Sequence, residues 1–234
     1  MSSQKLQIVR GILGHPGVTI LSSAAISNVE KPVAQRWVNR YFVPVLESFT
    51  GRAGDRLQCL HFGALDSLEA EGVREAGHDC RTASWDGWTL DAPSALFDVV
   101  FGGGFGRLAT DSGTRRRLAL ELARVTRPSG AVLLTLANSR CFLDLSGNTR
   151  ILHRMGDRFC LSLEEVRQLF IQPGLFREIQ LLSLSGHFGW TQAPGPLRGL
   201  RPLLEAYVTW SSDAAHPSRY AGPLNPVMNL WIVR

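Results

Sequence analysis

Short apolar runs alternate with amphipathic stretches through most of the chain. The runs LQCLHF, LFDVVF and GAVLLTLA are almost continuously apolar, as strands buried on both faces of a parallel sheet are. Between the runs, apolar residues recur three and four positions apart, which is typical of helices packed on a sheet. This alternation predicts an α/β fold with a doubly wound, mostly parallel sheet. The predicted strands span 57–62, 78–85, 96–101, 130–137, 177–185 and 227–234, and the clearest predicted helices 67–77, 114–127 and 162–170.

Local signals mark the ends of these helices. Ser162 precedes an apolar-periodic stretch and Glu165 follows three residues later, which predicts a capping box. Gly77 is placed to close the preceding helix in the left-handed conformation that follows many helix ends. Pro128 is expected to stop the third helix.

The pattern divides the chain into three regions. Residues 1–50 comprise an arm without clear periodicity and then an amphipathic helix that starts after Pro32. Residues 51–187 hold the predicted α/β core. Residues 188–234 begin with a segment rich in proline and glycine, which suits a cover over the sheet or a docking surface, and end in the last core strand.

Composition and net charge indicate which kinds of binding partner to expect. The 234 residues are 44% hydrophobic and 19% charged, which is ordinary for a globular protein. The net charge of +5 favours anionic partners only mildly, because the basic residues are spread out. The dense run at 115–117 opens a predicted helix, so we interpret it as a solvated face and expect no nucleic-acid binding.

Cysteine spacing indicates whether a metal site is expected, and hydropathy indicates whether the chain is expected to cross a membrane. The four cysteines form no CxxC pair and lack zinc-site spacing, so no metal is expected. No apolar run approaches the roughly 20 residues that span a bilayer, and the first residues are polar. We therefore expect a cytoplasmic protein without a membrane span.

The block from 96 to 138 resembles the central block of class I S-adenosylmethionine (SAM)-dependent methyltransferases. That family typically reads "sFDvV", then "l.E..RvLrPGG.l.l"; here FDVV is followed by LALELARVTRPSGAVLLTLAN. Further on, LSLEEVRQLFIQPGLFREIQLL resembles the family's "lsleelr.ll..aGF..v". The resemblance covers roughly residues 50–190. It implies a Rossmann-like sheet whose last strand is antiparallel, and SAM as cofactor.

The cofactor turn departs from the family pattern "vLDvGcGtG". Matched to it, the stretch GDRLQCLHFGALDS has Cys59 at the carboxylate, His61 at the first glycine and Leu65 at the third, so that only Gly63 is kept. Side chains at these positions would intrude on the ligand or require positive φ, which costs about 1 kcal/mol or more. We expect His61 to stand in the turn, where it plugs the cofactor site or binds something new.

A second difference lies at the end of the second strand, where the family carries an acidic residue for the ribose hydroxyls. Ser84 takes that place, and Asp86 follows two residues later. Asp86 could take over the ribose role; equally, an aspartate before glycine is a common turn residue. The short distance from Gly77 to FDVV leaves little room for a further helix and strand, so a trimmed sheet edge is expected.

Glycines follow the FDVV strand in FGGGFGRL. Gly102 and Gly103 fall at the carboxyl end of a central strand, where open α/β sheets bind ligands. They are candidates for close approach to the cofactor, and the alternative is a loop that needs positive φ. At the corresponding end of the next strand, Asn138 either faces the cleft or caps the strand.

His187 is the candidate catalytic residue. It follows the predicted strand REIQLLSLS and could act as a general base beside an acceptor pocket lined by Phe188 and Trp190. The alternative is a histidine packed at a strand end.

The resemblance implies a SAM-dependent methyltransferase-like protein that methylates a small molecule or a protein side chain. The altered turn supports a second hypothesis, an inactive methyltransferase-fold pseudoenzyme that acts as a scaffold or regulatory partner subunit. A protein partner or a homo-oligomer is compatible with either.

Overall fold

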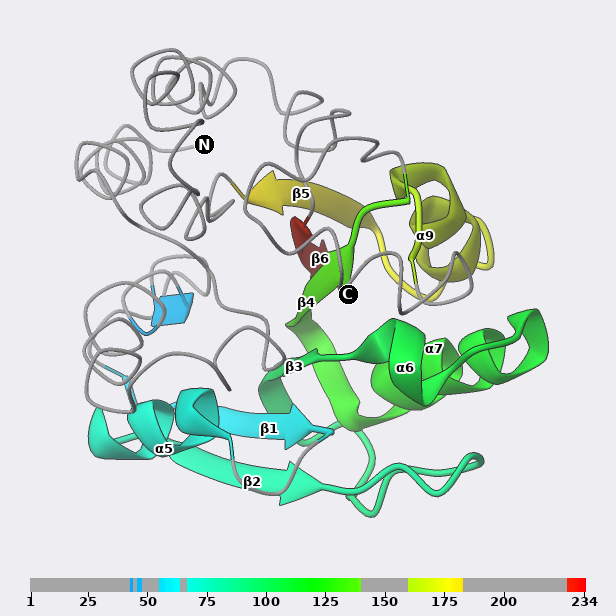
Figure 1. Cartoon of the computed structure of the whole chain (residues 1–234). Helices are drawn as coiled ribbons and strands as arrows, with labels where there is room; N and C mark the ends of the chain where they lie inside the picture. Colours follow the sequence, from blue (N-terminus) through cyan, green and yellow to red (C-terminus); the bar gives the residue numbers. More distant parts are fainter. Residues whose placement is uncertain (1–42, 44–45, 48–54, 64–66, 140–159, 183–226) are drawn as a thin grey trace, which may run out of the picture.

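A single mixed sheet forms the centre of the molecule. The computed structural model describes residues 43, 46–47, 55–63, 67–139, 160–182 and 227–234, and the structural statements below concern these. Six strands lie in the order β2-β1-β3-β4-β6-β5 (Figure 1). The first four are parallel, and β6 runs antiparallel to both β4 and β5. The predicted sheet, with its antiparallel last strand, is confirmed. The strands are β1 (Gln58–Phe62), β2 (Asp79–Ala83), β3 (Phe97–Gly103), β4 (Thr126–Ala137), β5 (Glu178–Leu182) and β6 (Val227–Val233).

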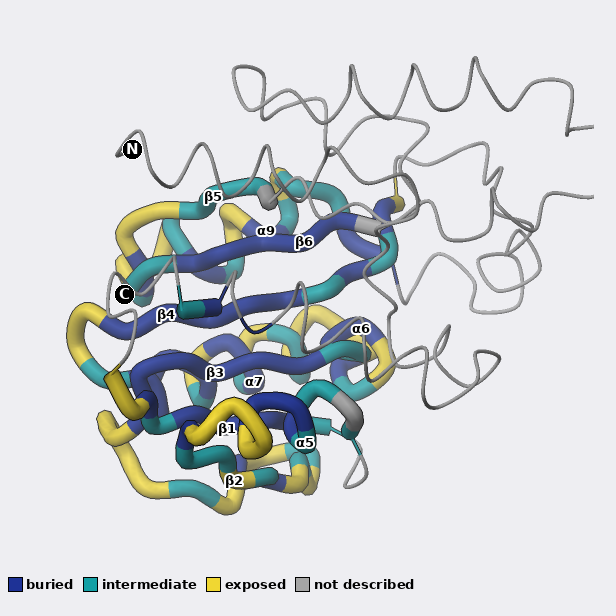
Figure 2. The backbone as a smooth tube through the Cα atoms, turned by 90° about the vertical axis from the view of Figure 1, so that its left-hand side faces the viewer, coloured by how far each residue is buried: buried dark blue, intermediate teal, exposed yellow. Residues whose placement is uncertain are grey.

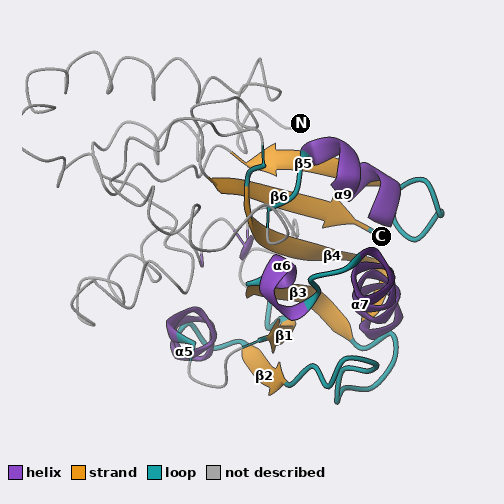
Figure 3. Ribbon diagram, turned by 45° about the vertical axis from the view of Figure 1, so that its right-hand side comes forward, coloured by secondary structure: helices purple, strands orange, loops and turns teal. Residues whose placement is uncertain are grey.

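Helices pack on both faces of the sheet (Figure 3). On one face, α5 (Leu68–Glu75) buries Ala70 and Val73 against Cys59 and its neighbours. On the other, α7 (Ser112–Val125) and α9 (Leu163–Phe170) cover the larger core. Cys59 of β1 belongs to the first core, and Leu60 and Phe62 belong to the second. The strand is therefore buried on both sides, as its apolar run predicts, and Figure 2 colours the backbone by this burial.

Local signals set most helix ends where they were predicted. The Ser162 hydroxyl accepts from the Glu165 N–H and the Glu165 carboxylate accepts from the Ser162 N–H, which confirms the capping box. Gly77 has φ 91° just after the end of α5. The expected stop at Pro128 is wrong, because α7 ends at Val125 and β4 begins at the next residue, so that the proline lies within the strand.

Asp98 in the FDVV stretch joins three strands. Its buried carboxylate accepts from the Gln58 N–H of β1 at 2.7 Å and pairs with Arg127 of β4 at 2.5 Å. A buried charge is tolerated only when paired and hydrogen-bonded. This pair gives Asp98 and Arg127 a structural role in joining the strands.

The trimmed sheet edge is confirmed. Residues 84–96 contain neither helix nor strand, apart from one bridge between Trp85 and Leu90, and β2 lies at the edge of the described sheet. A short helix that the pattern did not predict, α6 (Phe105–Leu108), follows Gly104. Of the helices in the described ranges, none is long and apolar enough to cross a membrane.

Candidate functional site

The carboxyl ends of β1 and β3 form the point where strand order reverses, since β2 lies on one side of β1 and β3 on the other. Open α/β sheets bind ligands in the crevice at such a point. At this point the chain carries glycines, which have no side chain. The chain leaves β1 at Gly63 with φ 120°, and a Cβ there would lie 3.4 Å from the Gly103 carbonyl oxygen. The two glycines Gly63 and Gly103 are therefore neighbours at this point of the sheet.

Small and polar residues lie next to these two glycines along the carboxyl edge of the sheet. Thr135 of β4 is the partner of Gly103, and Asn229 of β6 is the partner of Thr135. The Thr135 hydroxyl donates to the Asn229 Oδ1 at 3.0 Å. At the other end, Ser84 follows the last residue of β2 and is exposed. Thr135 and Asn229 thus form a polar pair across β4 and β6, in which Asn229 is buried and Thr135 half-buried. Sequence reasoning missed this pair, although each residue interrupts an apolar run.

The structure corrects the position of His61. It lies inside β1, paired with Thr82 and Phe101, and is 4% exposed, so it does not stand in the turn. Because the strand ends at Phe62, Gly63 can also be matched to the family's first turn glycine. That second match is shifted by two residues and would put His61 at the carboxylate position.

His61 is an uncharged residue in this environment. Burial, and to a lesser extent the positive charge of Arg74, lowers its pKa to about 4. Its ring lies 5.3 Å from that of Phe101. Within the described part of the chain, neither its Nδ1 nor the Oγ1 of Thr82 has a hydrogen-bond partner. Two buried polar groups on neighbouring strands are thus left unsatisfied just before the turn, and such groups usually find a partner.

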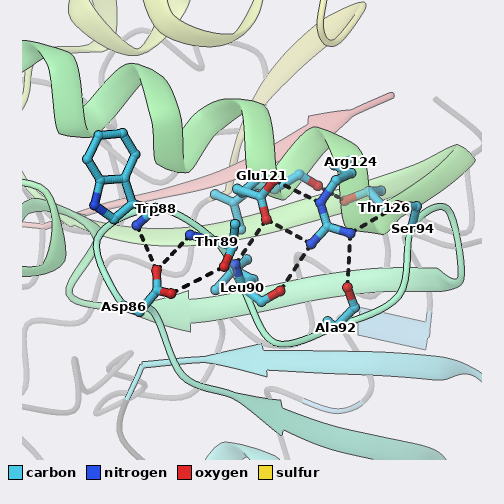
Figure 4. Close-up of polar contacts among 10 residues, drawn as sticks. Asp86, Trp88, Thr89, Leu90, Ala92, Ser94, Glu121, Arg124 and Thr126 are labelled. Carbon is cyan, nitrogen blue, oxygen red and sulfur yellow. Dashed lines mark hydrogen bonds and ion pairs between the residues drawn. The ribbon is translucent and has the colours of Figure 1, made fainter.

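Asp86 is engaged in its own turn (Figure 4). Its carboxylate accepts from the backbone N–H groups of Trp88 and Thr89, each at 2.7 Å, and these bonds lower its pKa. The turn alternative is therefore the one that the geometry favours. A role in ribose binding would require Asp86 to give up these bonds.

The two glycines of β3 differ in their surroundings. A Cβ at Gly102 would lie 2.4 Å from the Phe62 carbonyl oxygen and 3.0 Å from its ring. This glycine lets β3 pack closely against β1, and a role in binding stays a prediction. Gly103 is only partly buried and faces Gly63 through its carbonyl.

Other predicted positions lie beyond what the structure describes or have another role. Leu65 and His187 lie outside the described residues, so their roles remain predictions. Asn138 is buried and bridges to Leu161 beside the end of β4, which is consistent with the strand-end alternative. The described ranges contain no group of three residues that could hold a metal ion.

Glu121 and Arg124 of α7 close the loop that replaces the missing edge (Figure 4). Arg124 donates to Glu121, to the carbonyls of Leu90 and Ala92, and to the Ser94 hydroxyl. The Glu121 carboxylate also accepts from the Leu90 N–H at 2.9 Å, and the bond from Arg124 lowers its pKa. These two residues belong to the block that resembles the methyltransferases, and here they hold the part of the loop that leads into the start of β3.

No family model matches this sequence, and no curated protein matches it. Solved structures, in contrast, are similar to this chain in fold. A SAM-dependent methyltransferase from Archaeoglobus fulgidus is similar at TM-score 0.51 and 10% identity, over 88% of this chain and 95% of that one. A geranyl diphosphate C-methyltransferase from Streptomyces coelicolor, solved with Mg²⁺, geranyl diphosphate and S-adenosyl-L-homocysteine, has TM-score 0.44 and 13% identity over 99% and 97%.

A phosphoethanolamine N-methyltransferase from Haemonchus contortus, solved with SAM, has TM-score 0.48 and 15% identity. It is covered over 51% of its length by 82% of this chain, so the chain spans about half of that protein. With the strand order and the antiparallel β6, the similarity identifies the architecture: this chain has a class I SAM-dependent methyltransferase-like fold.

Proposed function

We propose that the chain binds SAM in the crevice between β1 and β3 and methylates a small-molecule acceptor. The bare backbone at Gly63 and Gly103 is the observation that carries the proposal. A Cβ at Gly63 would lie 3.4 Å from the Gly103 carbonyl oxygen, at the reversal of strand order where open α/β sheets in general bind ligands.

The residues around the crevice fit a nucleoside with an unusual set of partners. The exposed Ser84 is the candidate for the ribose hydroxyls at the end of β2. His61 and Thr82 supply neutral hydrogen-bonding atoms beneath the turn, in place of a carboxylate. An uncharged partner attracts a cationic amino group less strongly than a carboxylate does, so we expect weaker binding than a carboxylate would give.

When bound, SAM supplies an electrophilic methyl group, and the protein's part is to hold an acceptor in line with it. Thr135 of β4 is half-buried and donates to the buried Asn229 of β6. Its hydroxyl is our candidate for orienting the polar end of an acceptor. His187, with Phe188 and Trp190, remains the predicted acceptor-side group.

A second candidate function is that of a scaffold with the methyltransferase fold and no catalysis. The observation that favours it is the engagement of Asp86 in its own turn. Each lost hydrogen bond to a charged group costs about 1–3 kcal/mol, or roughly tenfold to a hundredfold in affinity. Several such losses together would leave the crevice empty at cellular SAM concentrations.

Isothermal titration calorimetry with SAM and with S-adenosylhomocysteine separates the two functions. The proposal predicts saturable binding to the full chain and a loss of about tenfold or more in the Gly63→Ala variant. Gly77→Ala is the matched control. It also places a Cβ at positive φ, but in open space after α5, and should leave affinity within about twofold.

The outcomes are distinct. No binding at millimolar concentration of either nucleoside would refute the methyltransferase proposal and support the scaffold. Binding that is insensitive to Gly63→Ala would place the nucleoside elsewhere. A methyl-transfer assay on a panel of small amines, alcohols and carboxylates then identifies the acceptor class.

A further inference from the structure

Cys59 and Cys80 lie side by side on neighbouring strands. They are direct partners in the parallel pairing of β1 with β2, so their side chains leave the same face of the sheet, the face that α5 covers. Both are free thiols. Neighbouring strands lie about 4.8 Å apart, which is within the Cα–Cα range of about 4.4–6.8 Å that disulfides span. The backbone therefore already holds the two cysteines at a separation that one disulfide can bridge.

The sulfur of Cys80 is turned toward β1. It donates to the Arg81 carbonyl at 3.8 Å, and this carbonyl belongs to the alternate set of β2 groups that bond to β1. The backbone N–H of His61, two positions after Cys59 in β1, also bonds to this sulfur. Burial, and then the charge of Cys80 close by, raises the pKa of Cys59. The two sulfurs are therefore near each other as well as the two backbones.

The two thiols differ in how easily a small oxidant reaches them. Cys59 is fully buried beneath α5, whereas Cys80 is half-buried on β2, at the edge of the described sheet (Figure 1). The Arg74 guanidinium lies beside Cys80, since its Nε donates to the Cys80 carbonyl at 3.1 Å. Burial raises the pKa of Cys80 to about 11, and the positive charge of Arg74 opposes this rise. Cys80 is therefore the thiol that is oxidised first, slowly at neutral pH, and Cys59 is the thiol that reacts with it afterwards.

We propose that Cys59 and Cys80 form a reversible disulfide when the protein is exposed to a peroxide. Hydrogen peroxide oxidises the Cys80 thiol to a sulfenic acid and is itself reduced to water. The Cys59 sulfur then attacks the Cys80 sulfur, and the hydroxyl group leaves with the Cys59 proton as a second water while the S–S bond forms. The reaction needs no SAM, so it stands or falls independently of the proposed function.

The geometry of paired strands makes this bond easy to reduce. Side chains of direct partners leave the sheet nearly parallel, so the Cβ atoms start about 4.8 Å apart, wider than the roughly 3.5–4.5 Å of a relaxed disulfide. Strained disulfides are the ones that cellular thiols reduce readily. Two molecules of glutathione would therefore restore both cysteines and leave as glutathione disulfide. In the oxidised form the edge strand β2 is fastened to β1.

The test treats the native full chain with hydrogen peroxide, blocks the remaining thiols with N-ethylmaleimide and digests the product with trypsin. Cleavage after each arginine leaves Cys59 in peptide 57–74 and Cys80 in peptide 75–81. We expect mass spectrometry to find these two peptides joined, and to find them separate again after native treatment with reduced glutathione. In Cys59→Ser the sulfenic acid at Cys80 should persist and react with dimedone. Cys160→Ser removes another buried cysteine and is the matched control, in which the joined peptides should still form.

Oxidation should also slow amide hydrogen exchange in β2 by about tenfold or more, because the bond closes a loop in the unfolded chain. Unchanged exchange in the joined product would refute the fastening of the edge strand. Three other results would overturn the proposal. They are a link from Cys80 to Cys141 or Cys160 instead, oxidation of Cys80 to a sulfinic acid without any link, and a Cys59–Cys80 bond that glutathione does not reduce.

Discussion

Gly63 and Gly102 lack side chains for different reasons. Gly63 has φ 120°, which residues with a side chain rarely adopt, and its Cβ direction faces the Gly103 carbonyl oxygen. Gly102 has an ordinary φ, but a Cβ would lie 2.4 Å from a carbonyl oxygen of the neighbouring strand. Gly102 therefore has a packing role, while a binding role stays a prediction for both, and a run of glycines in a sequence does not distinguish the two kinds of position.

Gly102→Ala should destabilise the protein by about 3 kcal/mol, because β1 and β3 must separate to admit the methyl group. Gly77→Ala should cost about 1 kcal/mol, from backbone strain alone. Urea unfolding measures both. Equal losses in the two variants would contradict the packing role of Gly102.

His61 should make stability depend on pH. Its pKa is about 4 in the folded chain and about 6.5 when unfolded. Below pH 6.5 the unfolded chain therefore binds a proton that the folded chain does not. The contribution is fully present above pH 6.5 and is lost as pH falls toward 4, by roughly 3 kcal/mol. Unfolding of His61→Phe should show a flatter pH dependence in this window, and an unchanged slope would contradict the assignment.

The position of His61 also shows where sequence matching reached its limit. The residue types of the family turn can be matched to this chain in two registers, two residues apart. Only the end of β1, which depends on pairing with Thr82 and Phe101, decides between them. Cross-strand pairing is tertiary information that a local pattern does not carry.

At the scale of elements, the loop 84–96 stands where a helix and a strand were expected to be missing. Side chains of α7 hold this loop, because it forms no β-strand with a backbone hydrogen-bond ladder. Arg124 supplies most of the bonds, and it forms them with three different groups of the loop besides Glu121. The guanidinium of an arginine has several N–H donors that point in different directions, so it can bond acceptors that lie apart. The ammonium of a lysine is a single nitrogen and cannot reach all of them.

Arg124→Lys should therefore loosen the loop while it preserves charge. We expect faster hydrogen exchange at the Leu90 amide, which donates to Glu121, and a loss of about 1–2 kcal/mol in stability. Arg167→Lys on the exposed face of α9 is the control and should change neither. Protection of Leu90 that is equal in both variants would mean that Arg124 does not hold the loop.

The apolar pattern predicted which helices and strands are present better than it predicted where each of them begins and ends. All six strands and the helices α5, α7 and α9 lie where apolar periodicity placed them. The start of α9 followed from its capping box, whose two bonds are local. α6 was missed because its four residues are too few to show a helical period. The division of the chain into regions 1–50, 51–187 and 188–234 stays a proposal.

On the scale of the whole molecule, β6 holds two parts of the sheet together. It pairs with β4 from Ala131 to Ala137 and with β5 from Glu178 to Leu182. Leu230 and Ile232 are fully buried in the core that α7 and α9 cover. The last strand is thus an interior strand of the sheet, although it lies farthest along the chain.

Leu230→Ala should cost about 2–5 kcal/mol, from lost burial and the cavity left behind. The same substitution at Leu120, which is 47% exposed, should change stability by no more than about 0.5 kcal/mol. Thermal unfolding of both variants checks this, and a small effect at Leu230 would show that β6 is dispensable for the core. Deletion of residues 227–234 should abolish soluble expression.

Strand order also has a consequence for synthesis. β4 and β5 both leave the ribosome before β6, the strand that lies between them, so each emerges with an apolar edge that has no neighbour. Until β6 arrives, the nascent chain carries two templates for wrong pairing with other chains. This protein should consequently depend on chaperones while it is being translated, and the dependence should be strongest in the interval between β5 and β6.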